Sequence, residues 1–151
     1  MLKSKNSYEL PLPADAVTEI VKASESHSGA YEGSIDFATP LNTPILAAAD
    51  GNVIRVRDDS DKYGQEPSFG PDVNYITIEH ANNELSEYLH LAKDSAFVKS
   101  GDIVKSGQQI AVTGLSGWLY APHLHFMIYD KAPKKFQCKS IRFKQPLQLK
   151  F

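Results

Sequence analysis

The stretch Ala121-Pro122-His123-Leu124-His125-Phe126-Met127-Ile128-Tyr129 is the part of this chain that decides its fold. Read with a period of two, its leucine, phenylalanine and isoleucine share one face, which is entirely apolar. The two histidines, His123 and His125, lie on the opposite face. The pattern predicts a β-strand that buries one face in a core and presents two imidazoles side by side on the other.

Two imidazoles placed in this way can serve one small site. Alternate residues of a strand lie roughly 6.5–7 Å apart, so His123 and His125 could be two metal ligands, or one ligand and one acid or base. A helix would not keep residues two apart on one face. The alternative is a pair of solvated histidines on an exposed strand, and the other histidines of the chain decide between the two interpretations.

Length and composition place limits on the class of protein. The chain has 151 residues, which is typical of one domain, and 42% of them are hydrophobic, enough to form a core. The 16 basic and 18 acidic residues are spread along the chain, with a net charge of −2, so the basic stripe of a nucleic-acid binder is absent. No apolar run approaches the length of a transmembrane helix.

The N-terminus and the cysteine content bear on the compartment. Residues 1–7 lack the apolar segment of a signal peptide, so either the protein stays inside the cell or its signal or anchor is missing from this sequence. The single cysteine, Cys138, excludes an internal disulfide and is expected to be structural. One cysteine does not identify the compartment.

The sequence pattern of most of the chain is typical of a β-protein. Residues 1–23 are expected to form an extended N-terminal arm with one short element, a helix or a strand, over residues 14–22. Residues 24–151 are expected to form the main domain, with a long polar loop over residues 58–72 that is expected to border a site. Strands with turns at close spacing predict a mostly β fold with little helix. They are expected over residues 34–38, 45–48, 52–57, 75–80, 85–91, 109–112, 121–129 and 140–143.

Three further histidines have to be placed. His80 follows Ile76 and Ile78 on the apolar face of its strand, which predicts a core histidine with a hydrogen-bond partner. His90 ends a strand and by alternation shares a face with Ser86 and Tyr88. His27 lies in a small, polar stretch that is typical of a loop.

Asp36 stands out because it lies between Ile35 and Phe37 in an apolar segment. A partly buried carboxylate needs a cation, a metal or hydrogen-bond donors, although an aspartate that caps a turn is the simpler explanation. Three protein ligands and an open water position are the pattern of a catalytic zinc site. His27, Asp36 and His125 could supply the ligands, which leaves His90 and His123 to move a proton or stabilise an oxyanion. Spacing alone does not assign these roles.

Taken together, these motifs resemble the lysostaphin-type zinc endopeptidases, peptidase family M23, which cut peptidoglycan. The resemblance runs from about Tyr8 to about Phe143. The motifs that carry it are Pro122-His123-Leu124-His125-Phe126, Ile35-Asp36-Phe37-Ala38-Thr39-Pro40, Asn42-Thr43-Pro44 through Asp50-Gly51-Asn52-Val53, Tyr88-Leu89-His90-Leu91 and the two Val-Lys-Ser-Gly segments that begin at Val98 and Val104.

The resemblance implies an antiparallel β-sheet groove (a duplicated hybrid motif) and a zinc ion as cofactor. It implies His27, Asp36 and His125 as the metal ligands, and His90 and His123 as the catalytic histidines. The expected substrate is a peptide stem or cross-bridge of bacterial peptidoglycan, and the expected location is therefore the cell envelope, periplasmic or extracellular.

The sequence departs from the family pattern at the first ligand and before the two-histidine motif. In the commonest family form a histidine lies four residues before the aspartate, where this chain has Glu32. Ser26-His27-Ser28-Gly29 matches a longer form of the segment, so His27 is the expected ligand and Glu32 the substitute. Bulky Trp118 and Tyr120 stand where small polar residues are expected, and they either line the groove or pack.

Two other functions remain open from the sequence. The first is a catalytically silent module of the same family that activates other wall hydrolases; such a module should lack one or more of the five site residues. The second is a phosphotransfer domain on a similar β scaffold with two histidines. The combination of Asp36 with the His123–His125 pair favours a metal over a phosphohistidine.

Overall fold

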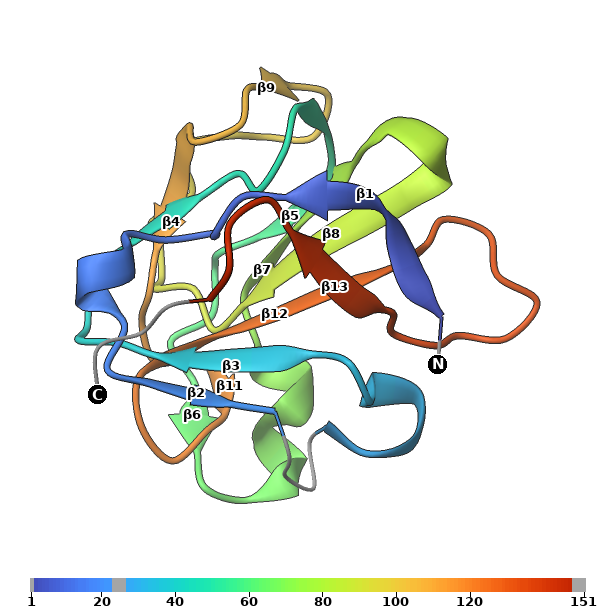
Figure 1. Cartoon of the computed structure of the whole chain (residues 1–151). Coiled ribbons are helices and arrows are strands. Elements are labelled where there is room, and N and C mark those ends of the chain that lie inside the picture. Colours follow the sequence, from blue (N-terminus) through green and yellow to red (C-terminus); the bar gives the residue numbers. More distant parts are fainter. Residues whose placement is uncertain (1, 23–26, 148–151) are drawn as a thin grey trace.

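The computed structural model describes residues 2–22 and 27–147, and within them the protein is built almost entirely of strands. The largest sheet has seven strands in the order β2-β3-β12-β8-β7-β5-β9, and every neighbouring pair is antiparallel (Figure 1). The strands are β2 (Glu19–Val21), β3 (Ile35–Ala38), β12 (His123–Asp130), β8 (Glu84–Leu89), β7 (Tyr75–Glu79), β5 (Gly51–Arg57) and β9 (Ile103–Val104).

The other strands form three two-stranded pairs around this sheet. β1 (Lys3–Tyr8) runs parallel to β13 (Ser140–Phe143), β4 (Pro44–Leu46) antiparallel to β10 (Gln109–Val112), and β6 (Tyr63–Gly64) parallel to β11 (Gly117–Trp118). The helical elements whose bounds are described are short 3-10 turns, namely η1 (Ala14–Ala16), η3 (Gly29–Tyr31), η4 (Pro67–Asp72) and η5 (Ala81–Asn83). None of them is long and apolar enough to cross a membrane. The expected mostly β fold with little helix is confirmed.

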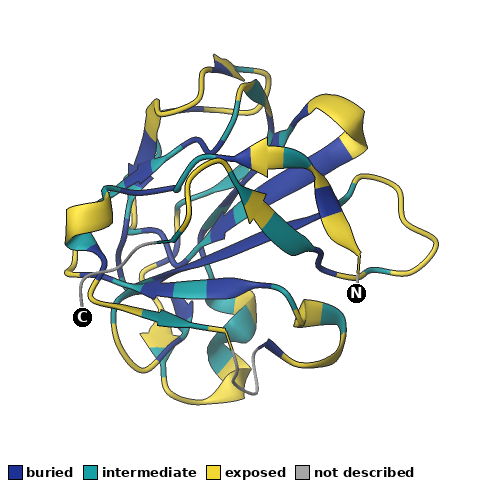
Figure 2. Ribbon diagram, in the orientation of Figure 1, coloured by how far each residue is buried: buried dark blue, intermediate teal, exposed yellow. Residues whose placement is uncertain are grey.

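Strand β12 has the two faces that its alternation predicts. Leu124, Phe126 and Ile128 are fully buried in the main core, where Phe126 packs on Tyr88 of β8 at a ring-centroid distance of 5.3 Å. On the other face Met127 belongs to a second, smaller apolar cluster. Because both faces are covered, β12 is dark blue along nearly its whole length in Figure 2. The strand is therefore a rigid support for the histidines at its beginning.

The pairing register fixes which side chains meet on the histidine face. His125 pairs with Asp36 of β3, and Asp36 pairs with Val21 of the edge strand β2. One row further on, His123 pairs with Ala38, which pairs with Glu19. Directly opposed residues of antiparallel strands point to the same face, so these two rows form one surface across three strands.

The structure also places the segments that the sequence left open. Residues 14–22 contain both alternatives, the 3-10 turn η1 followed by strand β2. The extended arm includes β1, which is paired with β13. The polar loop over residues 58–72 is less irregular than expected, since it contains β6 and η4. Strand β6 pairs with β11, beside the histidines.

Candidate metal centre

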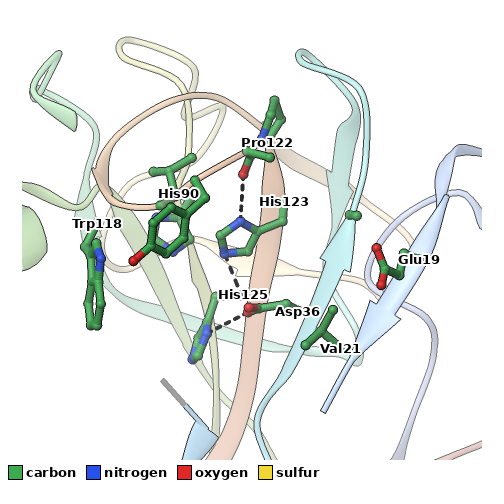
Figure 3. A pocket seen from close by; sticks show the side chains of 12 residues that line it. Glu19, Val21, Asp36, His90, Trp118, Pro122, His123 and His125 are labelled. Atoms are coloured by element: carbon green, nitrogen blue, oxygen red, sulfur yellow. Dashed lines mark hydrogen bonds and ion pairs between the residues drawn. The ribbon is translucent and has the colours of Figure 1, made fainter. Parts of the chain in front are cut away.

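Asp36 is the centre of a cluster of histidines on this surface. Its Oδ2 lies 3.0 Å from Nε2 of His27 and its Oδ1 lies 2.9 Å from Nδ1 of His125. One ligand atom from each of the three residues lies within 4.8 Å of the others. Nε2 of His123 lies 3.5 Å from Oδ1 of the same carboxylate (Figure 3). The structure therefore brings the three expected ligands together, with His123 next to them.

Backbone carbonyls fix the orientation of three of the histidine rings. Nδ1 of His27 lies 2.7 Å from the carbonyl oxygen of Ser34. Nδ1 of His90 lies 2.7 Å from that of Ser116, and Nδ1 of His123 lies 2.9 Å from that of Ala121. A carbonyl oxygen can only accept, so Nδ1 carries the hydrogen in each ring. In the neutral ring Nε2 then keeps its lone pair, which is the form that binds a metal or takes a proton.

His27 has a buried ring nitrogen that faces a carboxylate. Its Nε2 is buried and makes no hydrogen bond within the described residues, although it lies 3.0 Å from the Asp36 carboxylate. A lone pair that faces a carboxylate is repelled unless a proton or a metal ion lies between them. Burial lowers the pKa of His27, but contact with Asp36 outweighs burial and raises it above the ordinary value. The environment therefore demands positive charge at this point, and a His₂Asp donor set fits zinc.

Asp36 is ionised in this surrounding. Burial by itself would raise the pKa of its carboxyl group, but the contacts with His125 and His27 and the proximity of His123 hold the pKa far below its ordinary value. An ionised carboxylate is the form that ligates a metal. The explanation of Asp36 as a simple turn cap does not account for these contacts.

His90 and His123 form a second pair beside the ligand set. Their ring centroids are 4.5 Å apart. Burial lowers the pKa of His90 to about 3, and the neighbouring His123 contributes to that shift. Burial also lowers the pKa of His123. Both rings are therefore neutral near pH 7, with an Nε2 lone pair available as a proton acceptor.

The prediction that His90 shares a strand face with Ser86 and Tyr88 is wrong. Alternation places it with Tyr88, whose ring is in the main core, yet its imidazole stacks near His123 on the opposite face. Strand β8 ends at Leu89, and His90 has φ 73°, a left-handed conformation that is uncommon outside glycine. This local departure from strand geometry turns the ring into the site. Such strained residues cluster at functional sites.

A buried asparagine that the sequence did not single out supports His90. The Asn74 carbonyl accepts the backbone N–H of His90 at 3.0 Å, and the Asn74 side chain donates to the carbonyls of Ser60 and Leu91. The hydroxyl of Ser116, the residue whose carbonyl holds the His90 ring, accepts the Asn74 backbone N–H at 3.0 Å. The one feature of the sequence that could have indicated this role is the position of Asn74 immediately before strand β7.

The remaining residues named from the sequence lie as follows. His80 is a buried core histidine, bonded through Nδ1 to the Asp50 carbonyl and through Nε2 to the Ser86 hydroxyl, as expected. Glu32 is exposed and is not part of the three-residue ligand group. Trp118 and Tyr120 both line a cleft of about 520 Å³ that is also lined by His90, His123 and His125.

A family model named Peptidase family M23 matches residues 30–137. The chain belongs to peptidase family M23. The family assignment expected from the sequence motifs is thereby confirmed, and the five clustered residues lie within or just before the matched range.

Individual relatives agree with the family assignment. Two proteins of Vibrio cholerae named as peptidoglycan DD-endopeptidases, ShyB and ShyA, are 44% identical over 93 residues and 38% identical over 91 residues. These matches cover 62% and 60% of this chain but 19% and 18% of the relatives, so the chain spans about one fifth of their length.

Solved structures show the same fold. A zinc-containing peptidase from Vibrio cholerae has a TM-score of 0.61 at 34% identity, over 83% of this chain and 37% of that one. The catalytic domain of lysostaphin from Staphylococcus simulans has a TM-score of 0.55 at 27% identity, over 71% of this chain and 73% of that one. The antiparallel groove expected from the resemblance is therefore the fold of this M23 domain.

Proposed function

We propose that this M23 chain is a zinc-dependent endopeptidase that hydrolyses peptide bonds in the stems or cross-bridges of bacterial peptidoglycan. The observation that carries the proposal is the buried Nε2 of His27, which faces the Asp36 carboxylate without a hydrogen bond. His125 completes the proposed ligand set. The names of the DD-endopeptidase relatives support peptidoglycan as the substrate.

The two remaining histidines fit the roles of acid, base and oxyanion donor. Zinc held by His27, Asp36 and His125 would lower the pKa of a water molecule and polarise the substrate carbonyl. His90 and His123 present neutral Nε2 atoms to the same cleft. One of them would accept the proton of the attacking water at its Nε2 lone pair. The other, once it carries a proton on Nε2, would stabilise the developing oxyanion or protonate the leaving amine.

Peptidoglycan as substrate places the protein in the cell envelope, either in the periplasm or outside the cell. The main alternative is a catalytically silent M23 module that activates other wall hydrolases. The presence of all five site residues in one cluster favours the enzyme, because a silent module is expected to have lost some of them.

The decisive experiment measures zinc and hydrolysis on the same preparation. Purified protein is expected to hold about one zinc ion per chain and to release peptide fragments from purified peptidoglycan. Treatment with a chelator should abolish the release, and added zinc should restore it. A protein that binds zinc but cuts nothing would support the silent module, and one that refuses zinc would end the enzyme proposal.

A further inference from the structure

Glu19 lies on the wall of the cleft at the edge of the large sheet. In the pairing register it is aligned with Ala38 and then with His123, so the three residues form one row across strands β2, β3 and β12. Adjacent strands are about 4.8 Å apart, which separates the backbones of Glu19 and His123 by roughly 10 Å. The methyl group of Ala38 leaves the floor between them low, and Figure 3 shows Glu19 across this floor from the histidines.

The Glu19 carboxylate is a free negative charge. It is exposed, and within the described residues its side chain has no ion pair or hydrogen bond. The other carboxylate of the cleft, Asp36, is already engaged by histidines. No lysine or arginine of the described residues lines the cleft. A cation that entered this half of the cleft would therefore meet an unpaired anion and no repulsion from the side chains that line it.

The other end of the groove has a different character. Beyond His90 and His125 a second hollow is lined by Tyr31, Val73 and Leu89 and is shared with Trp118, and the described residues of its wall include no carboxylate. A peptide that crosses the histidines would thus lie with one end near an anion and the other near apolar and aromatic side chains. Such an asymmetry would favour a substrate with a cationic group on one side of the bond to be cut.

We propose that Glu19 is a specificity-determining residue that binds the free side-chain ammonium group of a diamino acid near the scissile bond. This inference rests on the proposed peptidase function. The carbon chain of the diamino acid would cross Ala38, and its ammonium group would pair with the Glu19 carboxylate. Glu19 makes no contact with the proposed zinc ligands in this arrangement, so it would act on substrate selection and not on metal binding.

The test compares one substrate in two forms. Cross-linked peptidoglycan fragments with free side-chain amines are compared with the same fragments after acetylation of those amines. The wild-type protein should cleave the free form with a kcat/KM about three- to fivefold higher, the range of a partly exposed ion pair. In Glu19→Gln, which keeps the shape and removes the charge, the ratio should fall to about one.

Matched controls separate the charge from other effects. Glu32→Gln removes an exposed carboxylate that does not line the cleft, and it should keep the wild-type ratio. Raising the ionic strength should reduce the ratio of the wild-type protein, because salt screens an exposed pair. Zinc content should be the same in the wild-type protein, Glu19→Gln and Glu32→Gln.

Two results would overturn the inference. Equal cleavage of the free and acetylated fragments by the wild-type protein would show that the ammonium group is not recognised, while the peptidase function would stand. A Glu19→Gln protein that keeps the wild-type ratio would exclude Glu19 as its partner. Failure of the wild-type protein to cut either form would instead contradict the proposed function itself, and the inference with it.

Discussion

The chemistry of each imidazole in this M23 domain depends on what its second nitrogen contacts. The carbonyls of Ser34, Ser116 and Ala121 each accept a hydrogen from Nδ1 of one ring. Nε2 of His27 therefore faces Asp36, and His90 and His123 offer Nε2 to the cleft. His125 is the exception, because its Nδ1 faces Asp36 at 2.9 Å. Among the proposed ligands, His27 therefore offers Nε2 and His125 offers Nδ1. The two proposed catalytic histidines, His90 and His123, both offer Nε2.

This arrangement predicts that metal binding and catalysis separate by mutation. His90→Ala and His123→Ala should keep zinc and lose activity about 10²–10⁴-fold, the scale of a lost acid, base or oxyanion donor. Asp36→Ala and His125→Ala should lose zinc, and activity with it. Zinc content and release of peptide fragments are measured on the same preparations. Loss of zinc from His123→Ala but not from His125→Ala would reverse the two roles.

A second prediction concerns the first ligand. His27→Ala should lose zinc because it removes the buried Nε2 that faces Asp36. Glu32→Ala should keep zinc, since Glu32 is exposed and lies outside the ligand group. Both variants are titrated with zinc and compared for affinity. Zinc binding that survives the first substitution and fails after the second would assign Glu32 as the ligand.

The sequence identified all five clustered residues, but the site also depends on features that it does not display. Alternation correctly placed His123 and His125 on one face, since β12 is regular throughout. Alternation failed at His90, because a single left-handed residue ends the strand and turns the ring over. The support from Asn74 was missed because its partners are far away in the chain, such as Ser116, 42 residues on.

At the scale of elements, one buried carboxylate joins three parts of the fold. Glu84 at the start of β8 accepts the backbone N–H groups of Lys5 and Asn6, the hydroxyl of Tyr8 and the ammonium group of Lys139. Its side chain is fully buried. It therefore ties strand β1 and the segment before β13 to the large sheet, which carries the histidines.

Replacing this carboxylate should be costly. Glu84→Gln places an amide among donors and removes the buried partner of Lys139, which keeps the half-exposed Asp130 at 2.6 Å. The free energy of unfolding should therefore fall by about 3 kcal/mol and Tm by about 6–12 °C. Glu79→Gln is the matched control, because it breaks a partly exposed pair with Lys131. That change should cost less than about 1 kcal/mol. Thermal and urea unfolding measure both variants.

The same residue predicts a dependence of stability on pH. Burial would raise the pKa of Glu84, but the hydrogen bonds from Lys139, Asn6 and Lys5 lower it below its ordinary value of 4.5. The folded state therefore binds this proton less tightly than the unfolded state does. The stabilisation is complete above the ordinary value and is lost as pH falls through the lower, folded pKa. The stability difference between the wild-type protein and Glu84→Gln should shrink below about pH 4.5. If the stability difference between the two proteins stayed constant as the pH fell below about 4.5, this account would be contradicted.

The elements that the sequence predicted well are those formed by local pattern. The hairpin of β7 and β8 and the strand β12 carry long alternating runs, and the structure has them. The two-residue strands β6 and β11 were missed because they exist only through pairing with each other, across more than 50 residues of chain. Short segments of this kind have no periodicity to detect.

At the scale of the whole molecule, the N-terminal arm is part of the domain. Strand β1 pairs with β13 near the other end of the chain, and Figure 1 shows the two side by side. Tyr8 and Leu12 of the arm are almost fully buried in the main core. The matched family range begins only at residue 30, so the arm completes the core from outside that range.

Deleting residues 1–13 should therefore unfold the domain or leave it barely stable. Burial of Tyr8 and Leu12 contributes about 1.5–3 kcal/mol each, and the loss of the bonds from β1 to Glu84 adds about 3 kcal/mol. The sum, about 6–9 kcal/mol, is comparable with the whole stability of an ordinary domain, about 5–15 kcal/mol. Leu2→Ala is the control, because Leu2 is exposed on the same arm and its loss should leave Tm unchanged. Circular dichroism and thermal unfolding make the comparison. A truncated protein that melts within a few degrees of the full chain would show that the domain is complete without the arm.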